Sequence, residues 1–413
     1  MNQNCSMDEI MESLIFIRQN FRWLIAGFLL AFFGSFGQTY FVSIYAGELQ
    51  NEFSLSHGEW GGIYMIGTLI SAFTMFFVGG LTDVFRARTL SVIVMVCLAC
   101  ACVSMSFISS AFLLVFAVFA LRLFGQGLSS HIAMVSMARW FVATRGRALA
   151  FAALGFAFGQ AILPLSFVAI SSAIGWRQSW LIAAGIAICA APLLYILLIR
   201  ERTPQAVAKE NNSTGMQDRH WTRNQVLKHW LFWLILPAYL GPATFGTSFF
   251  FHQVHFAEFK GWTHLQFVAL FPLLTGLSVL VTMTSGWVID LFKSGRLMQF
   301  YVFPFAISFV LFWYVDSLTG AAIAMSIMAI TIGLQSTLSA AFWAEYFGTQ
   351  YLGSIKSMAT VAMVFGSAIG PGLTGWLIDN GVAFVDQMLG IAIYLLIATV
   401  MTTIGVRKSR DLS

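Results

Sequence analysis

Twelve runs of mostly apolar residues recur along this chain of 413 residues, and each run is bounded by charged or polar residues. About 20 apolar residues in an α-helix are enough to cross the hydrocarbon core of a bilayer. The predicted spans are 23–45, 58–80, 90–108, 112–137, 148–174, 180–199, 230–254, 266–289, 297–315, 318–344, 354–378 and 387–406. Only 9% of the residues are charged, whereas water-soluble domains carry about 25%. The sequence therefore predicts an all-α membrane protein with twelve transmembrane helices.

The remaining composition argues against several other classes of protein. The net charge of +5 does not indicate a nucleic-acid partner, because the positive residues stand singly at helix ends. Cys97 and Cys100 have the spacing of metal ligands, but they lie inside an apolar run without a second ligand pair. The sequence has no phosphate-binding loop, dinucleotide fingerprint or nucleophile elbow at a convincing spacing. We therefore expect no metal, no cofactor and no enzymatic activity.

Lysine and arginine are distributed very unequally between the two sides of the predicted membrane protein. With an even number of spans, both termini and the polar segment 200–228 share one side, which collects nearly all of these cations. The other side holds only Arg177 and Lys260. By the positive-inside rule, both termini are predicted to be cytoplasmic. We expect a multi-pass, monomeric protein in the lipid bilayer of a bacterial inner membrane.

The two halves of the chain match each other at a fixed offset of 207 residues. Rare residue types coincide in the pairs Trp23 and Trp230, His57 and His264, Asp83 and Asp290, and Pro164 and Pro371. Thr68 with Thr275 and Ser71 with Ser278 are further pairs. Duplication of a six-span unit explains these matches better than chance. Several transporters place two such bundles around a central site and open it alternately to either side.

The predicted segments follow from this duplication. They are a leader over 1–22, a first bundle over 23–199, a linker over 200–229, a second bundle over 230–406 and a tail over 407–413. The linker is the only long polar interruption of the apolar pattern, which is typical of a connection between two units.

The loop after the second span reads Gly79-Gly80-Leu81-Thr82-Asp83-Val84-Phe85-Arg86-Ala87-Arg88, and the loop 207 residues later reads Gly286-Trp287-Val288-Ile289-Asp290-Leu291-Phe292-Lys293. This pattern resembles, in part, the loop signature of the major facilitator superfamily. The resemblance implies the major facilitator fold, with two pseudo-symmetric six-helix bundles. It also implies a latch at the cytoplasmic gate, for which the candidate residues are Gly79, Asp83, Arg86, Arg88, Asp290 and Lys293.

A second pattern resembles one branch of that superfamily. Arg139-Trp140-Phe141 is followed by Arg145-Gly146-Arg147-Ala148, then by Gly155, Gly159 and Pro164, with Arg122 and Gly125 upstream. This is similar to the oxalate/formate antiporter and monocarboxylate porter group. The resemblance implies symport or antiport of a small organic anion with a proton or a counter-anion. Members of that group commonly bind their anion with cations in spans eight and eleven, but span eight of this chain has none, and Lys356 lies near the start of span eleven.

The candidate substrate site centres on Arg122, about ten residues into span four. A charged side chain near the bilayer centre costs at least ~2.5 kcal/mol, so it should face protein, water or substrate. Gln126 and Ser129 share its helix face. Further polar stripes lie on spans one, seven and ten, at Gln38, Thr39, Thr244, Thr247, Ser248, Gln335 and Ser339. The resemblance places these helices around a cavity. Alternatively, Arg122 neutralises a neighbouring helix end and binds no substrate.

No carboxylate lies deep in a predicted span, so proton coupling would need another group. The candidates are His131, His252, His255 and Glu345. Histidine titrates near neutrality. A structural role at the membrane interface is the alternative for His252 and His255, and polar packing is the alternative for His131.

Two other functions remain open at the level of the sequence. Efflux of amphipathic compounds is one, because 41 phenylalanines and 18 methionines could form an adaptable apolar pocket. A transporter-like receptor that senses a solute is the other, although the linker and the tails leave little room for a signalling domain.

Overall fold

The structure is a computed structural model that describes residues 3–141, 144–199, 214–348 and 350–410. Side chains of residues 3–14, 83, 145, 336, 353, 354, 357 and 410 lie outside this description. Within these ranges the chain forms helices and turns and no β-strand. Among the described residues, twelve helices are long and apolar enough to cross a membrane. The predicted fold class, with its twelve spans, is confirmed.

The helices of the first half begin with α1, Gln3–Phe33, which is followed by the short α2, Thr39–Val42, and α3, Ala46–Phe53. Next come α4, His57–Val78, α5, Leu81–Val84, and α6, Ala87–Ser106. The fourth span consists of α7, Ala111–Leu121, a π-helix over Arg122–Ser129, and α8, Ser130–Trp140. The fifth and sixth spans are α9, Arg145–Ile174, and α10, Trp176–Leu197.

The second half repeats this order. A short helix α11, Arg223–Lys228, precedes α12, Trp230–Phe251, which continues into α13, Gln253–Phe259, and α14, His264–Val268. Then follow α15, Phe271–Phe292, α16, Ser294–Met298, and α17, Phe303–Tyr314. The last three spans are α18, Leu318–Phe347, α19, Leu352–Asp379, and α20, Phe384–Arg410.

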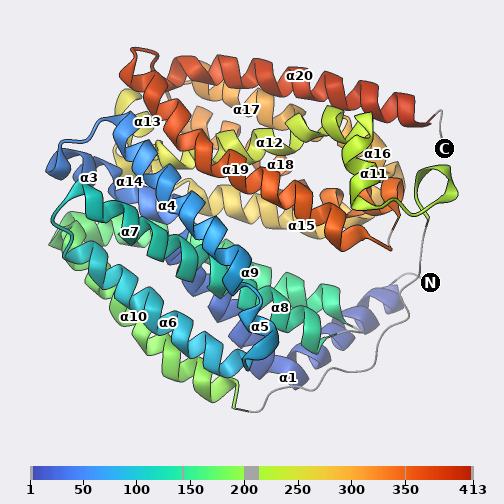
Figure 1. Ribbon diagram of the computed structural model, residues 1–413, viewed down its shortest axis with the longest axis horizontal. Helices are drawn as coiled ribbons and strands as arrows, with labels where there is room; N and C mark the ends of the chain where they lie inside the picture. Colours follow the sequence, from blue (N-terminus) through green and yellow to red (C-terminus); the bar gives the residue numbers. More distant parts are fainter. Residues whose placement is uncertain (1–2, 142–143, 200–213, 349, 411–413) are drawn as a thin grey trace.

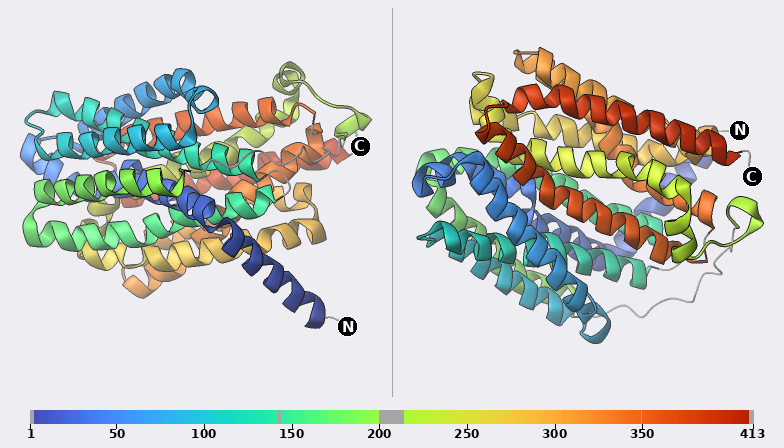
Figure 2. Two further views of the ribbon diagram at one scale, coloured as in Figure 1. Left: turned by 90° about the horizontal axis from the view of Figure 1, so that it is seen from below. Right: turned by 45° about the horizontal axis from the view of Figure 1, so that its top comes forward.

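The helices form two groups that lie side by side, α1 to α10 in one and α12 to α20 in the other (Figure 1). Helix α4 packs against α19, and α9 packs against α15, so these two pairs join the groups. Both chain ends lie at the same end of the molecule, which we call the terminal end. The opposite end carries α3, α13 and α14, and we call it the far end (Figures 1 and 2).

The first span differs from its prediction as one continuous helix over 23–45. Helix α1 ends at Phe33, and two short 3-10 turns, Gly34–Gly37 and Ser43–Tyr45, interrupt the path to α3. A Cβ atom on Gly37 would lie 2.0 Å from the carbonyl oxygen of Leu121, so the two backbones touch there. Only glycine permits such an approach. The break therefore follows from contact with the fourth span, which hydropathy alone does not reveal.

The predicted linker over 200–229 is described from residue 214 onward; residues 200–213 lie outside the described residues. The described part packs against the end of α18. The Trp221 amide donates a hydrogen bond to the carbonyl oxygen of Phe347 at 3.0 Å. The Arg219 guanidinium lies 3.9 Å from the centre of the Trp221 ring, which is a favourable cation–π contact. This part of the linker is thus attached to the second half.

Candidate functional site

A cavity of about 790 Å³ lies between the two halves toward the terminal end. Helices α9, α15, α18 and α19 form most of its wall, and Phe16 and Ile17 of α1 complete it. Its polar lining residues are Arg147, Gln160, Thr275, Ser278, Thr282, Gln335, Ser339, Lys356 and Thr360. The volume suits a small organic molecule, since ligand pockets of about 300–1,000 Å³ are usual. Both halves contribute, so relative movement of the halves would reshape the cavity.

Among the described side chains, the charged ones that line this cavity are Arg147 and Lys356, and both are exposed. Arg147 lies in the first turn of α9, in the first half. Lys356 lies in the second turn of α19, in the second half. Two cations at one mouth give a positive potential that attracts anions and raises their local concentration.

Sequence reasoning found part of this site. Gln335 and Ser339 of α18 line the cavity as predicted from their polar stripe. Lys356, considered at the sequence level for its place in span eleven, also lines it.

The polar residues predicted on span seven do not line this cavity. A Cβ atom on Gly366 would lie 2.5 Å from Thr244 Oγ1, and one on Gly370 would lie 2.7 Å from Ser248 Oγ. Thr244 and Ser248 therefore face α19, where they pack two helices of the second half together. The Thr247 hydroxyl donates to the carbonyl oxygen of its own helix at Ala243, at 2.6 Å. None of these three side chains belongs to the cavity lining in this conformation.

The residues predicted on spans one and four also lie away from the cavity lining. The Ser129 hydroxyl donates to the carbonyl oxygen of Leu30 at 2.6 Å and so joins the fourth span to α1. Gln38 and Thr39 are buried, and Thr39 shares a hydrogen bond with the hydroxyl of Tyr64. Gln126 is half-buried and does not line the cavity. None of these four side chains lines the cavity in this conformation.

Arg122 lies at the same break, with 4% of its surface exposed. Its Nη1 atom donates to the carbonyl oxygen of Gly37 at 3.3 Å and to Thr39 Oγ1 at 3.4 Å. The guanidinium also lies 5.2 Å from the centre of the Tyr64 ring. In this conformation Arg122 therefore joins three helices of the first half and does not line the cavity. These contacts fit the alternative role, in which the cation stabilises a helix end.

Sequence reasoning missed the polar residues on α9 and α15. Gln160 lies midway along α9, and Thr275, Ser278 and Thr282 lie on one face of α15 because their spacing is three and four residues. That spacing was a usable signal, and two of the three also belong to pairs in the internal repeat. The family resemblance instead indicates spans one, four, seven and ten as the wall of the cavity.

The predicted latch residues of the first half lie between the end of α4 and the first turn of α6, at the terminal end. Gly79 ends α4, and the Arg139 guanidinium donates to the carbonyl oxygen of Thr82 in the same loop, at 2.9 Å. The side chain of Asp83 lies outside the described residues. Arg86 is exposed, and the Arg88 guanidinium lies 4.9 Å from the centre of the Tyr195 ring.

The corresponding loop of the second half follows α15. Asp290 and Lys293 are both exposed, and Lys293 has a φ of 68°. A positive φ is unusual for lysine and marks a sharp turn between α15 and α16. The latch assigned to these residues stays a prediction.

The predicted coupling residues fall into two places. At the terminal end, a ring nitrogen of His131 lies 3.2 Å from the carbonyl oxygen of Gly79, and the Glu345 carboxylate accepts hydrogen bonds from the amide and the hydroxyl of Ser294. Both side chains hold loops in position there. His252 and His255 lie at the far end, where the two halves meet.

The far end is closed by contacts between the halves, which we call the far-end seal. The Asp379 carboxylate of α19 accepts hydrogen bonds from the Ser56 hydroxyl at 2.6 Å and from the amides of His57 and Gly58 at 3.1 and 2.8 Å. Nearby, the Ser43 hydroxyl donates to the carbonyl oxygen of Phe250 at 2.6 Å. These bonds all join the first half to the second.

Glycine allows the seal to close tightly. A Cβ atom on Gly61 would lie 2.5 Å from the carbonyl oxygen of Pro371, and one on Gly375 would lie 2.3 Å from that of His57. Helices α4 and α19 thus touch backbone to backbone at the far end. The halves are closed here, while a cavity separates them toward the terminal end.

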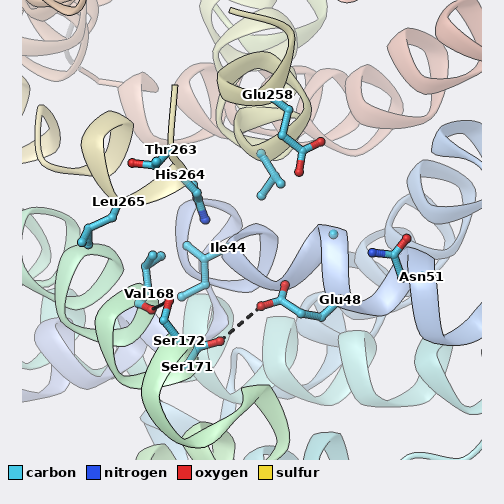
Figure 3. A pocket seen from close by; sticks show the side chains of 12 residues that line it. Ile44, Glu48, Asn51, Val168, Ser171, Ser172, Glu258, Thr263, His264 and Leu265 are labelled. Atoms are coloured by element: carbon cyan, nitrogen blue, oxygen red, sulfur yellow. Dashed lines mark hydrogen bonds between the residues drawn. The ribbon is translucent and has the colours of Figure 1, made fainter. Parts of the chain in front are cut away.

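A smaller pocket of about 330 Å³ lies beside the seal (Figure 3). Glu48 of α3, Glu258 of α13 and His264 of α14 line it, together with Ser171 and Ser172 of α9. The Ser171 hydroxyl donates to Glu48 at 3.2 Å. Burial raises the pKa of Glu48 above its ordinary value, and the carboxylate of Glu258 raises that pKa further. Glu48 therefore binds a proton more readily here than it would in water.

The described part of the chain contains no group of three or more histidine, cysteine, aspartate or glutamate side chains that could hold a metal ion. Cys97 is half-buried and Cys100 is exposed. Both line a largely apolar groove between α6 and α7.

Comparison with known proteins identifies the family. A family model described as Major Facilitator Superfamily matches residues 27–371. No curated protein shows significant similarity to the sequence.

Several solved structures share the fold. A bacterial homologue of the human lysosomal transporter Spinster, in an inward-facing and unoccupied conformation, matches with a TM-score of 0.71 and 15% identity, over 94% of this chain and 97% of the other. Its inward-facing, occupied form matches with a TM-score of 0.72 and 16% identity, over 93% and 96%. A mutant of the nucleoside transporter NupG matches with a TM-score of 0.65 and 13% identity, over 95% and 99%. The chain has the transporter fold, and it belongs to the Major Facilitator Superfamily.

Proposed function

We propose that this protein is a secondary transporter that moves a small organic anion, of the monocarboxylate type, across a bacterial inner membrane. The observation that carries the proposal is the cavity between the halves, whose charged lining residues are the cations Arg147 and Lys356. A carboxylate entering this cavity would exchange water for charge-assisted hydrogen bonds.

The arrangement supports alternating access. The cavity lies toward the terminal end and the far end is sealed, so a solute can enter from one side only. Closing the terminal end and breaking the far-end seal would pass the solute on, as in other transporters built from two repeated bundles. We assign the terminal end to the cytoplasm, because the lysine and arginine residues gather there.

The polar groups deeper in the cavity would orient the anion. Gln160 comes from the first half, while Thr275, Ser278 and Gln335 come from the second. The Gln335 amide lies 3.7 Å from Met363 Sδ, a weak contact that a substrate oxygen would replace favourably. We propose that these residues bind the substrate together with the two cations.

The test is uptake by the purified protein in proteoliposomes, with a panel of carboxylic acids. For an acid that is transported, Lys356→Gln and Arg147→Gln should each raise the KM by at least about tenfold, because a hydrogen bond to a charged group contributes about 1.5–3 kcal/mol. Arg407→Gln is the matched control, since Arg407 is an exposed cation of α20 that does not line the cavity. An unchanged KM in both cavity variants would contradict the anion site.

Efflux of amphipathic compounds is the second candidate, and one observation favours it. Much of the cavity wall is apolar, with Phe151, Phe156, Met283, Ile332 and Met363 among its residues. Such a wall can adapt to several hydrophobic solutes. Resistance profiles of a deletion strain, compared with its growth on single carboxylic acids, would separate the two functions.

A further inference from the structure

We propose that His57 and His255 form a proton-binding site across the far-end seal, and that proton uptake by this pair opens the far end. The proposal deepens the proposed function, since it names the ligand that shifts the balance between the two openings. His57 belongs to the first half and His255 to the second, so the pair exists only while the seal is closed.

The geometry of the pair carries the proposal. The two imidazole rings lie 4.3 Å apart between their centres. The Nε2 atom of His255 is buried and has no hydrogen-bond partner among the described residues. Two imidazolium ions at this distance would repel each other, and a buried imidazolium without an acceptor lacks the hydration it has in water. The closed seal therefore favours uncharged rings.

The partner of His57 is consistent with an uncharged ring. Its Nδ1 atom lies 3.0 Å from the amide nitrogen of Gln50, which can donate to it. An imidazolium carries a proton on both ring nitrogens and cannot accept that bond. Protonation of His57 would thus break the bond to Gln50 as well as repel His255.

Burial also favours the uncharged form of His255. Burial and the neighbouring His57 lower the pKa of His255 to about 4, from an ordinary value of 6.5. When the halves separate at the far end, water reaches the ring and this pKa returns toward 6.5. The open form therefore binds the proton more tightly than the closed form, and acid shifts the balance toward the open form.

Other titratable groups lie near the pair. His252, Asp379 and Glu258 of the second half interact electrostatically with it, Glu48 and His264 line the neighbouring pocket, and Glu59 lies in the first turn of α4. A ring nitrogen of His252 lies 3.2 Å from the carbonyl oxygen of Pro371 in its own half, and its ring centre lies 6.2 Å from that of His57, farther away than the ring of His255. Asp379 attracts a charged His57, but its oxygens already accept three hydrogen bonds.

Glu48 acts in the opposite direction. Its pKa is raised in the closed form, so proton uptake by Glu48 favours closure. Removing its carboxylate should therefore make the open-to-closed ratio depend more strongly on pH. This opposite sign allows an experiment to separate the histidine pair from the neighbouring carboxylates.

The experiment measures opening directly and needs no substrate. Spin labels are attached to cysteines at Ser109, between α6 and α7, and at Thr319, in the first turn of α18; both are exposed, and they belong to different halves. The five native cysteines are replaced first. Distances between the labels are recorded in lipid nanodiscs from pH 8 to pH 5. A single histidine with these two pKa values changes the open-to-closed ratio about thirtyfold over this range.

Variants then show which residues cause the opening by acid. His57→Gln combined with His255→Gln should remove most of the opening by acid, and His255→Lys should open the far end even at pH 8. Glu48→Gln should increase the opening by acid. His220→Gln is the matched control, since His220 belongs to the part of the linker attached at the terminal end, and it should respond like the unmodified chain.

Asp379→Ala tests whether the spin labels detect opening, because loss of the three hydrogen bonds should open the far end at every pH. If the labels separate in Asp379→Ala but the double histidine variant still opens with acid as the unmodified chain does, the proton site is wrong. If the labels do not separate even in Asp379→Ala, the far end does not open through this seal, and the proposed alternation fails as well.

Discussion

At the scale of single residues, charge and position together decide what a side chain can do. Lys356 and Arg122 are both cations in apolar helices, yet Lys356 is exposed in the cavity while Arg122 is 4% exposed and bonded to Gly37. The sequence marked both residues as unusual. It could not separate their positions, because the break in the first span that receives Arg122 depends on a contact between two helices.

The two roles predicted for Arg122 differ in their kinetic effect. The contacts in this conformation predict that Arg122→Gln lowers the thermal unfolding temperature and the maximal transport rate, while the KM for the anion stays within about twofold. The substitution leaves the buried acceptors at Gly37 and Thr39 without their donor, and a buried polar group without a partner costs about 1–3 kcal/mol. Lys356→Gln provides the comparison in the same uptake assay. A KM that rises as much in Arg122→Gln as in Lys356→Gln would support the substrate role instead.

At the scale of helices, the sequence predicted the number and order of the spans, because apolar length is a property of each segment alone. It did not predict the break after Phe33 or the π-helix over Arg122–Ser129, since both arise where Gly37 and Gly125 touch. Prediction of the site is limited in the same way by contacts between helices. Periodicity identifies a polar face of α15, but only the neighbouring helices decide whether that face meets a cavity.

The contact between Gly37 and the fourth span gives a prediction about stability. Gly37→Ala should destabilise the protein by about 1–3 kcal/mol, because its Cβ atom would lie 2.0 Å from the Leu121 carbonyl oxygen. Gly62→Ala is the control, since nothing lies within 4 Å of a Cβ atom there. Thermal unfolding in detergent compares the two variants. Equal unfolding temperatures would show that the two backbones do not touch as described.

At the scale of the whole molecule, the account depends on two halves that meet at one end at a time. The duplication in the sequence predicted two similar bundles, and the matched pair His57 and His264 begins α4 in the first half and α14 in the second. Which end is closed does not follow from the sequence, because apolar length predicts the spans and not the contacts between the two halves. The seal at Asp379 and the cavity at Lys356 supply that information.

A disulfide across the far end tests alternating access most directly. A Cβ atom on Gly47 would lie 3.4 Å from Val254 Cγ1, so Gly47→Cys and Val254→Cys should form a disulfide between the halves in a background without the native cysteines. We predict that oxidised protein in proteoliposomes transports no substrate and that reduction restores transport. Full transport by fully cross-linked protein would contradict the account.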